Sequence, residues 1–233
     1  MKKINIEKFK KMIGIKTNIH KVSFFHKEDI EKMNEKRILF LDLEFSKNKY
    51  IYEIGGFIIE KNKIVELIFK EYSLPNKEEV WDFQKNSFVV SKLNEDKPIF
   101  DEKEWFFKLL DSVDYIVVHN YVAEAQCIFK LLYPLEKYDI TKINYFNDLK
   151  IICTNYSFSN KYFKSKGMTD FKNSEISKYF GWEIMDTEDK LILKNKEIKF
   201  CIKKPKSMKS ELHNSFYDSA ITLTNFISLT KLI

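Results

Sequence analysis

Two acidic side chains interrupt an otherwise apolar segment, because Asp42 and Glu44 alternate with leucines in the run FLDLEF. The run predicts a strand, and successive side chains of a strand project to opposite faces, so the two carboxylates share one face. Without partners they would lose hydration and repel each other, and a divalent cation offsets both effects. Their alpha carbons would be ~6.5–7 Å apart, which lets both reach a pair of ions ~3.5–4 Å apart. An exposed sheet edge or an ion-paired acid couple is the alternative.

A third acid, Glu124, lies on the apolar side of a helix that we expect over residues 121–133. It shares the i, i+4, i+7 spacing with Ile128 and Leu131, which places all three on one helical face. That face is expected to point into the core, where an acid again favours a nearby cation. The sequence therefore predicts a second segment that contributes a carboxylate ligand.

Two histidines accompany these acids. His119 and Asn120 come at the end of an expected strand over residues 115–119, where α/β sheets contact ligands; a capping or core histidine is the other interpretation. His213 stands near the start of the closing helix that carries Asp218, and a helix N-terminus favours the neutral imidazole that can accept a proton. A histidine near an aspartate is ordinary, but three acidic segments together with this histidine are not.

The elements that must position these side chains follow from hydrophobic periodicity and turn residues. Three consecutive strands are expected to form a meander, followed by alternating helices and strands, which indicates an α/β domain with a mixed sheet covered by helices. The expected strands are residues 38–45, 50–60, 64–74, 115–119 and a hairpin within 190–204. The expected helices are residues 77–93, 101–111 with Asp101 as N-cap, 121–133, a segment from near Asp148, 173–180 and 212–230.

The composition favours one domain of ordinary size. The chain has 233 residues, of which 44% are hydrophobic, enough for one sizeable core. We expect this domain over residues 37–233, preceded by a lysine-rich helical extension over residues 1–36. The extension could pack on the domain, contact nucleic acid or present a solvated face. Three widely spaced cysteines predict neither a disulfide framework nor a zinc site, and each is expected in the core: Cys127, Cys153 and Cys201.

Charge and hydropathy indicate the location of the protein and the kinds of partner that we expect. No apolar run approaches the ~20 residues that span a bilayer, and lysines interrupt the apolar residues near the N-terminus, so we expect a cytoplasmic protein without membrane partners. The formal net charge of +6 fits a polyanionic partner weakly by itself. One lysine cluster immediately precedes His213 and either binds phosphate or forms a solvated loop. Its members are Lys203, Lys204, Lys206 and Lys209.

The order of these motifs resembles the DEDDh branch of the proofreading-type exonuclease superfamily, which includes RNase T, oligoribonuclease and the polymerase III proofreading subunit. The resemblance covers residues 37–233. It also includes YEIG at Tyr52–Gly55, Asn147–Leu149 before an expected helix, and the stretch 173–181. The three defining motifs are D-x-E at Asp42 and Glu44, H-N-x-x-x-D at His119, Asn120 and Glu124, and H-x-x-x-x-D at His213 and Asp218.

The resemblance implies an RNase H-like fold, with a mixed five-stranded sheet flanked by helices, and makes the 190–204 hairpin an insertion beside the site. It implies two divalent cations, Mg²⁺ or Mn²⁺, held by four acids, with His213 taking a proton from the attacking water. The products would be 5′-mononucleotides from the 3′ ends of single-stranded DNA or RNA, and a homodimer stays open because several relatives dimerise. Glu124 departs from the family's usual aspartate by one methylene. The implied metal ligands are Asp42, Glu44, Glu124 and Asp218.

Candidate substrate contacts surround this set. Phe45 and Ser46 follow the β-strand acids, and Phe45 either stacks on the terminal nucleotide or belongs to the core. Two other functional classes stay open. One is a degenerate exonuclease fold that binds nucleic acid or protein without cleavage, and the replacement of the usual aspartate by Glu124 would be the first sign of that degeneration. The other is a phosphatase or related phosphoester hydrolase. The remaining candidate contacts are His119, Asn120, Lys206 and Lys209.

Overall fold

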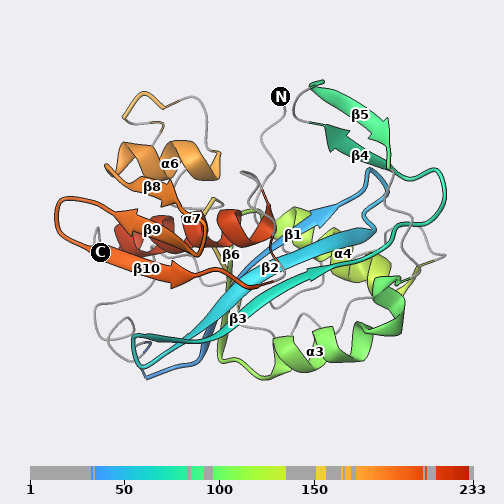
Figure 1. The fold of residues 1–233 in the computed structure, drawn as a ribbon, viewed down its shortest axis with the longest axis horizontal. Helices are drawn as coiled ribbons and strands as arrows, with labels where there is room; N and C mark the ends of the chain where they lie inside the picture. The colour runs from blue at the N-terminus through green and yellow to red at the C-terminus, as the bar shows by residue number, and fades with distance from the viewer. Residues whose placement is uncertain are drawn as a thin grey trace.

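The computed structural model has a five-stranded sheet at its centre (Figure 1). Residues 1–32 of the expected N-terminal extension, His213 and Lys209 lie outside the part of the chain that it describes, as does Asp148. The described residues are 33, 35–82, 85–91, 97–134, 151–155, 164, 166–168, 172–206, 208 and 214–230.

Three strands form the antiparallel part of this sheet and confirm the expected meander. β1 (Ile38–Phe45) pairs with β2 (Ile51–Glu60), and β2 pairs with β3 (Lys63–Glu71). The two-residue turn between β2 and β3 places Lys61 and Asn62 at positive φ, as tight hairpin turns require.

Two parallel strands complete the sheet on the other side of β1. The expected strand β6 (Tyr115–Val118) pairs with β1, and β7 (Ile151–Cys153) pairs with β6, which gives the order β3-β2-β1-β6-β7. The helix expected from near Asp148 is therefore wrong over residues 151–153. Three consecutive apolar residues carry no periodicity that separates a buried strand from a helix.

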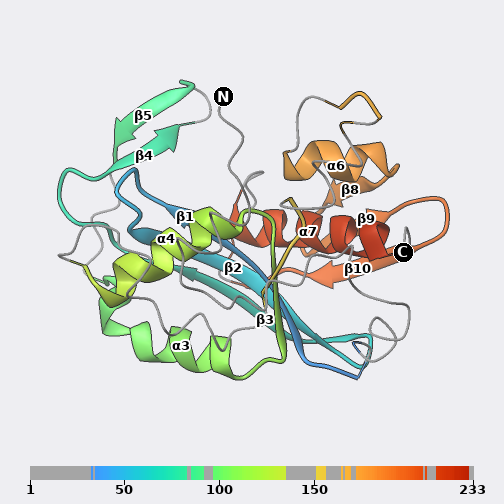
Figure 2. The ribbon, with the colours of Figure 1, turned by 180° about the vertical axis from the view of Figure 1, so that it is seen from behind.

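One face of the sheet is covered by two helices (Figure 2). α3 (Lys103–Asp111) and α4 (Tyr121–Leu132) bury their apolar sides there, against a cluster that includes Leu41 and Leu43 of β1. The expectation of a helix near 101–111 is confirmed, but Asp101 is not its N-cap. Glu102 is in that position without a side-chain cap, and a short 3-10 helix, η2 (Ile99–Asp101), precedes it.

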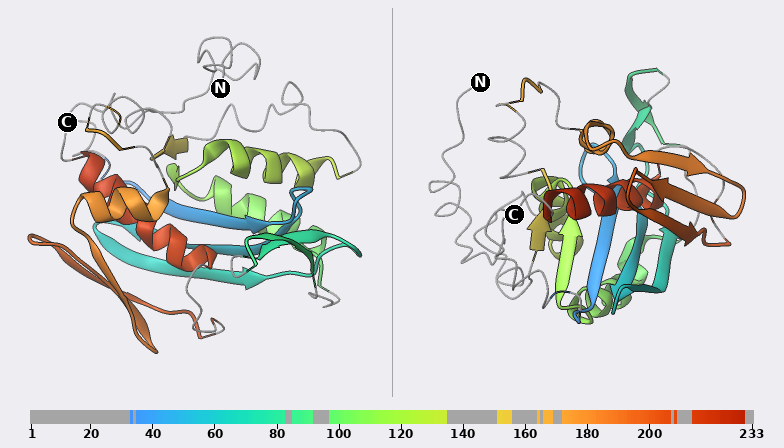
Figure 3. Two further views of the ribbon diagram at one scale, coloured as in Figure 1. Left: turned by 90° about the horizontal axis from the view of Figure 1, so that it is seen from above. Right: turned by 90° about the vertical axis from the view of Figure 1, so that its left-hand side faces the viewer.

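The other face carries the closing helix α7 (Ser215–Thr230) and α6 (Asn173–Tyr179), both expected from the sequence (Figure 3). Ile38 and Phe40 of β1 join the buried residues of these helices in a second core cluster. Since alternate residues of β1 serve opposite clusters, the strand is buried on both faces along its first half.

A second sheet packs beside α7. Its strands are β8 (Glu183–Asp186), β9 (Lys190–Lys194) and β10 (Lys199–Lys203), in the order β10-β9-β8. The hairpin expected within 190–204 is confirmed as β9 and β10, and β8 makes it three-stranded. Leu191 and Leu193 of β9 are fully buried in the same core cluster as α7.

The helix expected over residues 77–93 is wrong. The chain forms an antiparallel hairpin there, with β4 (Glu79–Asp82) and β5 (Ser87–Val90). The Trp, Phe and Val residues of the segment favour a strand. Asn86 adopts a φ of 50°, the left-handed conformation that asparagine tolerates in turns.

Two of the cysteines are in the core as expected. Cys127 and Cys153 are buried, whereas Cys201 is exposed because it alternates with the buried Ile202 along β10. Within the described parts of the chain, no helix combines the length and apolar character that crossing a membrane requires.

Candidate metal centre

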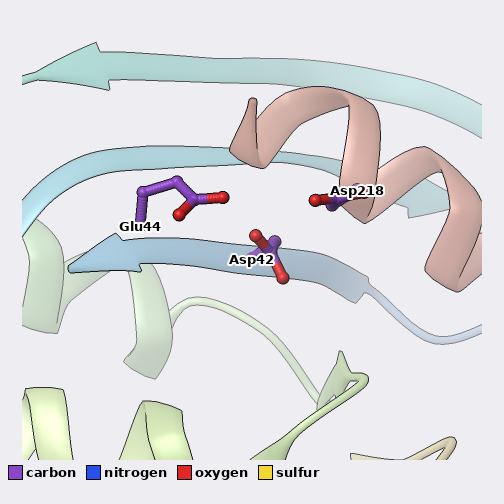
Figure 4. Close-up of side chains that lie close together, drawn as sticks. All are labelled: Asp42, Glu44 and Asp218. Atoms are coloured by element: carbon purple, nitrogen blue, oxygen red, sulfur yellow. The ribbon is translucent and has the colours of Figure 1, made fainter. Parts of the chain in front are cut away.

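The two acids of β1 project away from the leucines beside them, as the alternation along the strand predicted. Leu41 and Leu43 belong to the cluster under α3 and α4, while Asp42 and Glu44 project toward α7 (Figure 4). The pairing of β1 with β6 ends at Phe40, so both acids lie beyond the last residue that β6 pairs. The strand thus places the two carboxylates at a point where it no longer pairs with β6.

Helix α7 places a third carboxylate opposite them. One carboxylate oxygen from each of Asp42, Glu44 and Asp218 lies within 4.8 Å of the other two (Figure 4). Asp218 stands in the first turn of α7, where the unpaired N–H groups of the helix favour negative charge. Asn214 caps this turn, because its side-chain oxygen accepts the backbone N–H of Tyr217 at 2.8 Å.

Glu53 of β2 attaches the start of α7 to the sheet. Its Oε1 accepts both the backbone N–H and the hydroxyl of Ser215, each at 2.7 Å. Glu53 lies directly opposite Glu44 in the β1–β2 register, so one strand pair carries a candidate ligand and positions the helix of Asp218. Sequence reasoning included this residue in Tyr52–Gly55 but gave it no role. A carboxylate within an apolar, glycine-containing strand was the available signal.

Gly55 allows α7 to approach β2 closely. A Cβ on Gly55 would lie 2.0 Å from the backbone nitrogen of Phe216 and 2.4 Å from Ser215 Oγ. Any side chain there would displace the first turn of α7, and with it Asp218. The missing side chain therefore helps to set the separation between the acids of β1 and α7.

Glu124 approaches from α4. It is only 5% exposed, which confirms its inward position on the helix, and its Oε2 has no hydrogen-bond partner among the described residues. Its charge raises the pKa of Asp42, so the two carboxylates interact. It is not part of the group whose oxygens lie within 4.8 Å of one another.

Burial is the largest cause of the raised pKa values at this centre. The pKa of Asp42 is well above its usual range through burial and then the charge of Asp218. Burial, followed by Asp218, raises the pKa of Glu44 to about 8, and burial raises that of Glu124 to about 8. Lys49 is the one cation among the described groups that shift these pKa values, and it lowers the pKa of Glu124.

These residues fit hard divalent cations. Oxygen-only donors are the ligands that Mg²⁺ and Mn²⁺ prefer, and three carboxylates converge here. The buried Oε2 of Glu124 without a partner is a polar atom that a bound ion, or water on it, would satisfy. A positive ion would also favour the ionised carboxylates that burial and repulsion now disfavour.

The other predicted residues of the α4 segment lie close by in sequence but differ in environment. His119 is buried, and its Nδ1 lies 2.8 Å from Thr154 Oγ1, a contact that links the ends of β6 and β7. Asn120 is exposed at the N-cap position of α4 without capping it through its side chain. His119 therefore has the structural contact that a core histidine needs, whereas Asn120 faces solvent.

The side chains of the two residues after the β1 acids make local contacts within the protein. Phe45 packs partly against the core, and the Lys49 ammonium lies 3.9 Å from its ring centroid. Ser46 is fully buried, and its hydroxyl donates to Glu78 at 2.7 Å. The Ser46 side chain thus stabilises the turn after β1 and is not accessible to a substrate, contrary to its expected role.

The lysine cluster divides into exposed and buried members. Lys206 is exposed, as a phosphate-binding role requires, and Lys203 of β10 is exposed as well. Lys204 is 6% exposed and forms a buried ion pair with Asp186. Lys204 therefore anchors the segment after β10 and is not available for the predicted phosphate contact.

No protein-family model matches this chain, and no curated protein matches it. Its function must therefore be inferred from the side chains of the candidate metal centre and from their geometry.

Proposed function

We propose that the chain is a metal-dependent 3′→5′ exonuclease that releases 5′-mononucleotides from single-stranded DNA or RNA. The observation that carries this proposal is the convergence of Asp42, Glu44 and Asp218, together with the electrostatic interaction between Glu124 and Asp42. These acids belong to three motifs whose order and spacing resemble those of the DEDDh exonucleases. The sheet order, with three antiparallel and two parallel strands and helices on both faces, supports an RNase H-like fold for the domain.

Three elements, β1, α4 and α7, would supply the carboxylate ligands. Asp42 and Glu44 on a central strand and Asp218 on an attached helix would present preorganised ligands, and Glu124 would add a carboxylate from α4, directly or through water. Divalent cations bound there would supply Lewis acidity, which lowers the pKa of water and offsets charge on the scissile phosphodiester. His213 stands five positions before Asp218 in the sequence and would accept the proton of the attacking water.

The experiment compares single-stranded DNA and RNA labelled at either end, incubated with Mg²⁺ or Mn²⁺. We expect a 5′-labelled strand to shorten as a ladder and a 3′-labelled strand to release labelled mononucleotide at once. EDTA should stop both. Asp42→Ala should lower the rate by more than the ~10–100-fold that changes outside the first ligand shell typically cost. Glu71→Ala, which removes an exposed acid of β3, is the matched control and should cleave normally.

Three outcomes would contradict the proposal. Undiminished cleavage by Asp42→Ala would separate the activity from this centre. Retardation of a labelled oligonucleotide in a gel without any cleavage, with both metals present, would indicate a binding module. Turnover of a small phosphomonoester with an intact oligonucleotide would indicate a phosphatase.

A further inference from the structure

The hairpin of β4 and β5 presents aromatic side chains to solvent. Trp81 is 38% exposed and Phe88 44% exposed, and they are direct cross-strand partners. Their ring centroids are 5.1 Å apart at an interplanar angle of 79°, so the two rings meet edge to face. Val90, 60% exposed, lies two residues further along the same face of β5. Large apolar side chains gathered on one exposed face indicate a binding surface.

This hairpin is attached to the strand that carries the metal centre. Lys47 follows β1 and donates its backbone N–H to the carbonyl of Glu79 at 2.7 Å, while Ser46 donates its hydroxyl to Glu78. Lys47 is three residues after Glu44, a span of roughly 10 Å in extended chain. The hairpin accordingly stands at the end of β1 toward which Glu44 lies (Figures 1 and 2).

One lysine lies against the aromatic pair, and a second belongs to the same hairpin. The Lys47 ammonium is 5.4 Å from the ring centroid of Phe88 and also pairs with Glu79. Lys85, in the same hairpin, pairs with Asp82, and its side chain is 66% exposed. Both lysine side chains are more than half exposed, at 55% and 66%, which weakens their ion pairs, so a polyanion can compete for both ammonium groups.

From this combination we propose that the hairpin is a stacking platform for single-stranded nucleic acid. Unpaired bases would stack on Trp81 and Phe88, while Lys47 and Lys85 would contact the backbone phosphates. The inference rests on the proposed exonuclease function and adds a second binding site for the same strand, on the side away from the cleaved end. A strand held by its 3′ end at the metal centre must extend past Lys47 to contact the hairpin, so the contribution of the hairpin should grow with strand length.

The aromatic pair also has a plain structural role, because an isolated two-stranded hairpin needs cross-strand contacts to be stable. That role alone predicts a lower melting temperature for Trp81→Ala and no change in affinity for DNA. The stacking role predicts an affinity change that depends on strand length and that another aromatic residue restores. The effect of the substitutions on the affinity for DNA therefore distinguishes the stacking role from the structural role.

The first experiment measures binding with Ca²⁺ in place of the catalytic metal. Titration with single-stranded DNA of about ten nucleotides, within the ~4–16 that single-strand grooves hold, should quench tryptophan fluorescence through Trp81. Trp182 is 4% exposed, and Trp105 packs partly against the core with the Lys70 ammonium over its ring, so both rings are less accessible to a base than Trp81. Trp81→Phe should lose the quenching and keep the affinity, whereas Trp81→Ala should weaken binding roughly tenfold.

The second experiment measures cleavage against strand length. For Phe88→Ala we expect a raised KM with about ten nucleotides, an unchanged kcat, and no change with a dinucleotide. The matched control is Tyr179→Ala, which removes a 42% exposed aromatic residue on α6. This variant should change neither KM nor kcat with either substrate. Equal effects on short and long strands, an unaltered affinity in Trp81→Ala, or a monomer–dimer equilibrium that Trp81→Ala shifts would each overturn the platform.

The two proposals can fail separately. Normal cleavage with no length-dependent effect of Trp81 and Phe88 would remove the platform and leave the exonuclease. Quenching and binding that depend on Trp81 in a protein that never cleaves would keep the platform and remove the exonuclease.

Discussion

Asp42 is partly buried beside other carboxylates, and the charges of Asp218, Glu44 and Glu124 all raise its pKa in addition to desolvation. In the metal-free protein these charges are a source of instability, because each ionised group opposes the others in a site with little water. Evolution of a stable core alone would favour neutral residues at this position. The proposed divalent cation would offset this repulsion.

The first prediction follows for Asp42→Asn. This change keeps the shape of the side chain and removes one charge, so the metal-free protein should gain about 1 kcal/mol or more of stability, which is roughly 2–4 °C in melting temperature. The stabilisation that Mn²⁺ gives to the wild type should disappear, together with cleavage. Thermal melts in EDTA and in Mn²⁺ measure both effects. A variant that is destabilised in EDTA and still stabilised by Mn²⁺ would argue against Asp42 as a ligand.

The second prediction concerns the length of Glu124. Its Oε2 is buried without a partner among the described residues, and an aspartate would carry the same charge one methylene shorter. If Glu124 contacts a metal through water, Glu124→Asp should retain or increase the cleavage rate, whereas Glu124→Ala should lose it. Rate measurements at saturating Mn²⁺ test the pair. Loss of activity in Glu124→Asp would instead show that the pocket is built around the longer side chain.

At the level of elements, the start of α7 is fixed by contacts from β2. Glu53 accepts two hydrogen bonds from Ser215, and Gly55 gives the helix room to make them. Asp218 lies one turn along the same helix, so its position relative to Glu44 depends on this attachment. The geometry of the candidate metal centre is thereby linked to a residue that need not be a metal ligand.

The third prediction is that Glu53→Ala impairs metal binding from a distance. It leaves the N–H and hydroxyl of Ser215 without acceptors, which should cost about 1–3 kcal/mol and weaken Mn²⁺ affinity about 10–100-fold. Glu53→Gln keeps a carbonyl oxygen that can accept both bonds and should restore most of the affinity. Calorimetric Mn²⁺ titration compares the two. Equal losses in Gln and Ala would mean that the charge of Glu53, and not its hydrogen bonds, is required.

Glu71→Ala is the control for this comparison. Glu71 lies on β3 directly opposite Glu53, and its side chain is exposed. Its removal takes away a neighbouring charge without releasing α7, so Mn²⁺ affinity should stay within about twofold of the wild type.

The elements that sequence patterns predicted well are those with strong periodicity. The alternation of acids and leucines along β1 gave the correct faces, and the stripe of Glu124, Ile128 and Leu131 gave the buried side of α4. The hairpin of β4 and β5 was misread because its signals are local and mixed, and only pairing across Asn86 decides them. The contact between Glu53 and Ser215 joins residues 162 positions apart, a distance over which no pattern in a single sequence carries information.

At the level of the whole molecule, the succession of a meander and alternating helices and strands predicted a mixed sheet, and the observed order β3-β2-β1-β6-β7 confirms it. The order places β1 at the centre, between its antiparallel and parallel neighbours. A central strand is the most constrained position in a sheet, and it is the one that carries Asp42 and Glu44. The separate sheet of β8, β9 and β10 was only partly predicted, since β8 is four residues long with one face exposed.

The fourth prediction is a pH dependence of the whole fold. Burial raises the pKa values of Glu44 and Glu124 from 4.5 to about 8, so between these values the folded state binds more protons than the unfolded state. The stability of the metal-free protein should therefore fall as pH rises from about 4.5 to 8 and level off above 8. Saturating Mg²⁺ should oppose the fall, since it binds the ionised carboxylates.

Melting temperatures in EDTA and in Mg²⁺ across this pH range provide the measurement. The stabilisation by Mg²⁺ should be larger at pH 8 than at pH 6. Stability in EDTA that rises steadily between pH 5 and 8, with a Mg²⁺ effect that does not depend on pH, would contradict the electrostatic description of the centre.

The most direct measurement of the central claim is anomalous diffraction from crystals of the protein soaked in Mn²⁺. A peak should appear between the carboxylates of Asp42, Glu44 and Asp218, with oxygen ligands at ~2.0–2.2 Å. Crystals of Asp42→Asn, treated in the same way, should lose it. Carboxylates that turn away from one another, with manganese bound elsewhere or not at all, would contradict the claim that these acids form a metal centre.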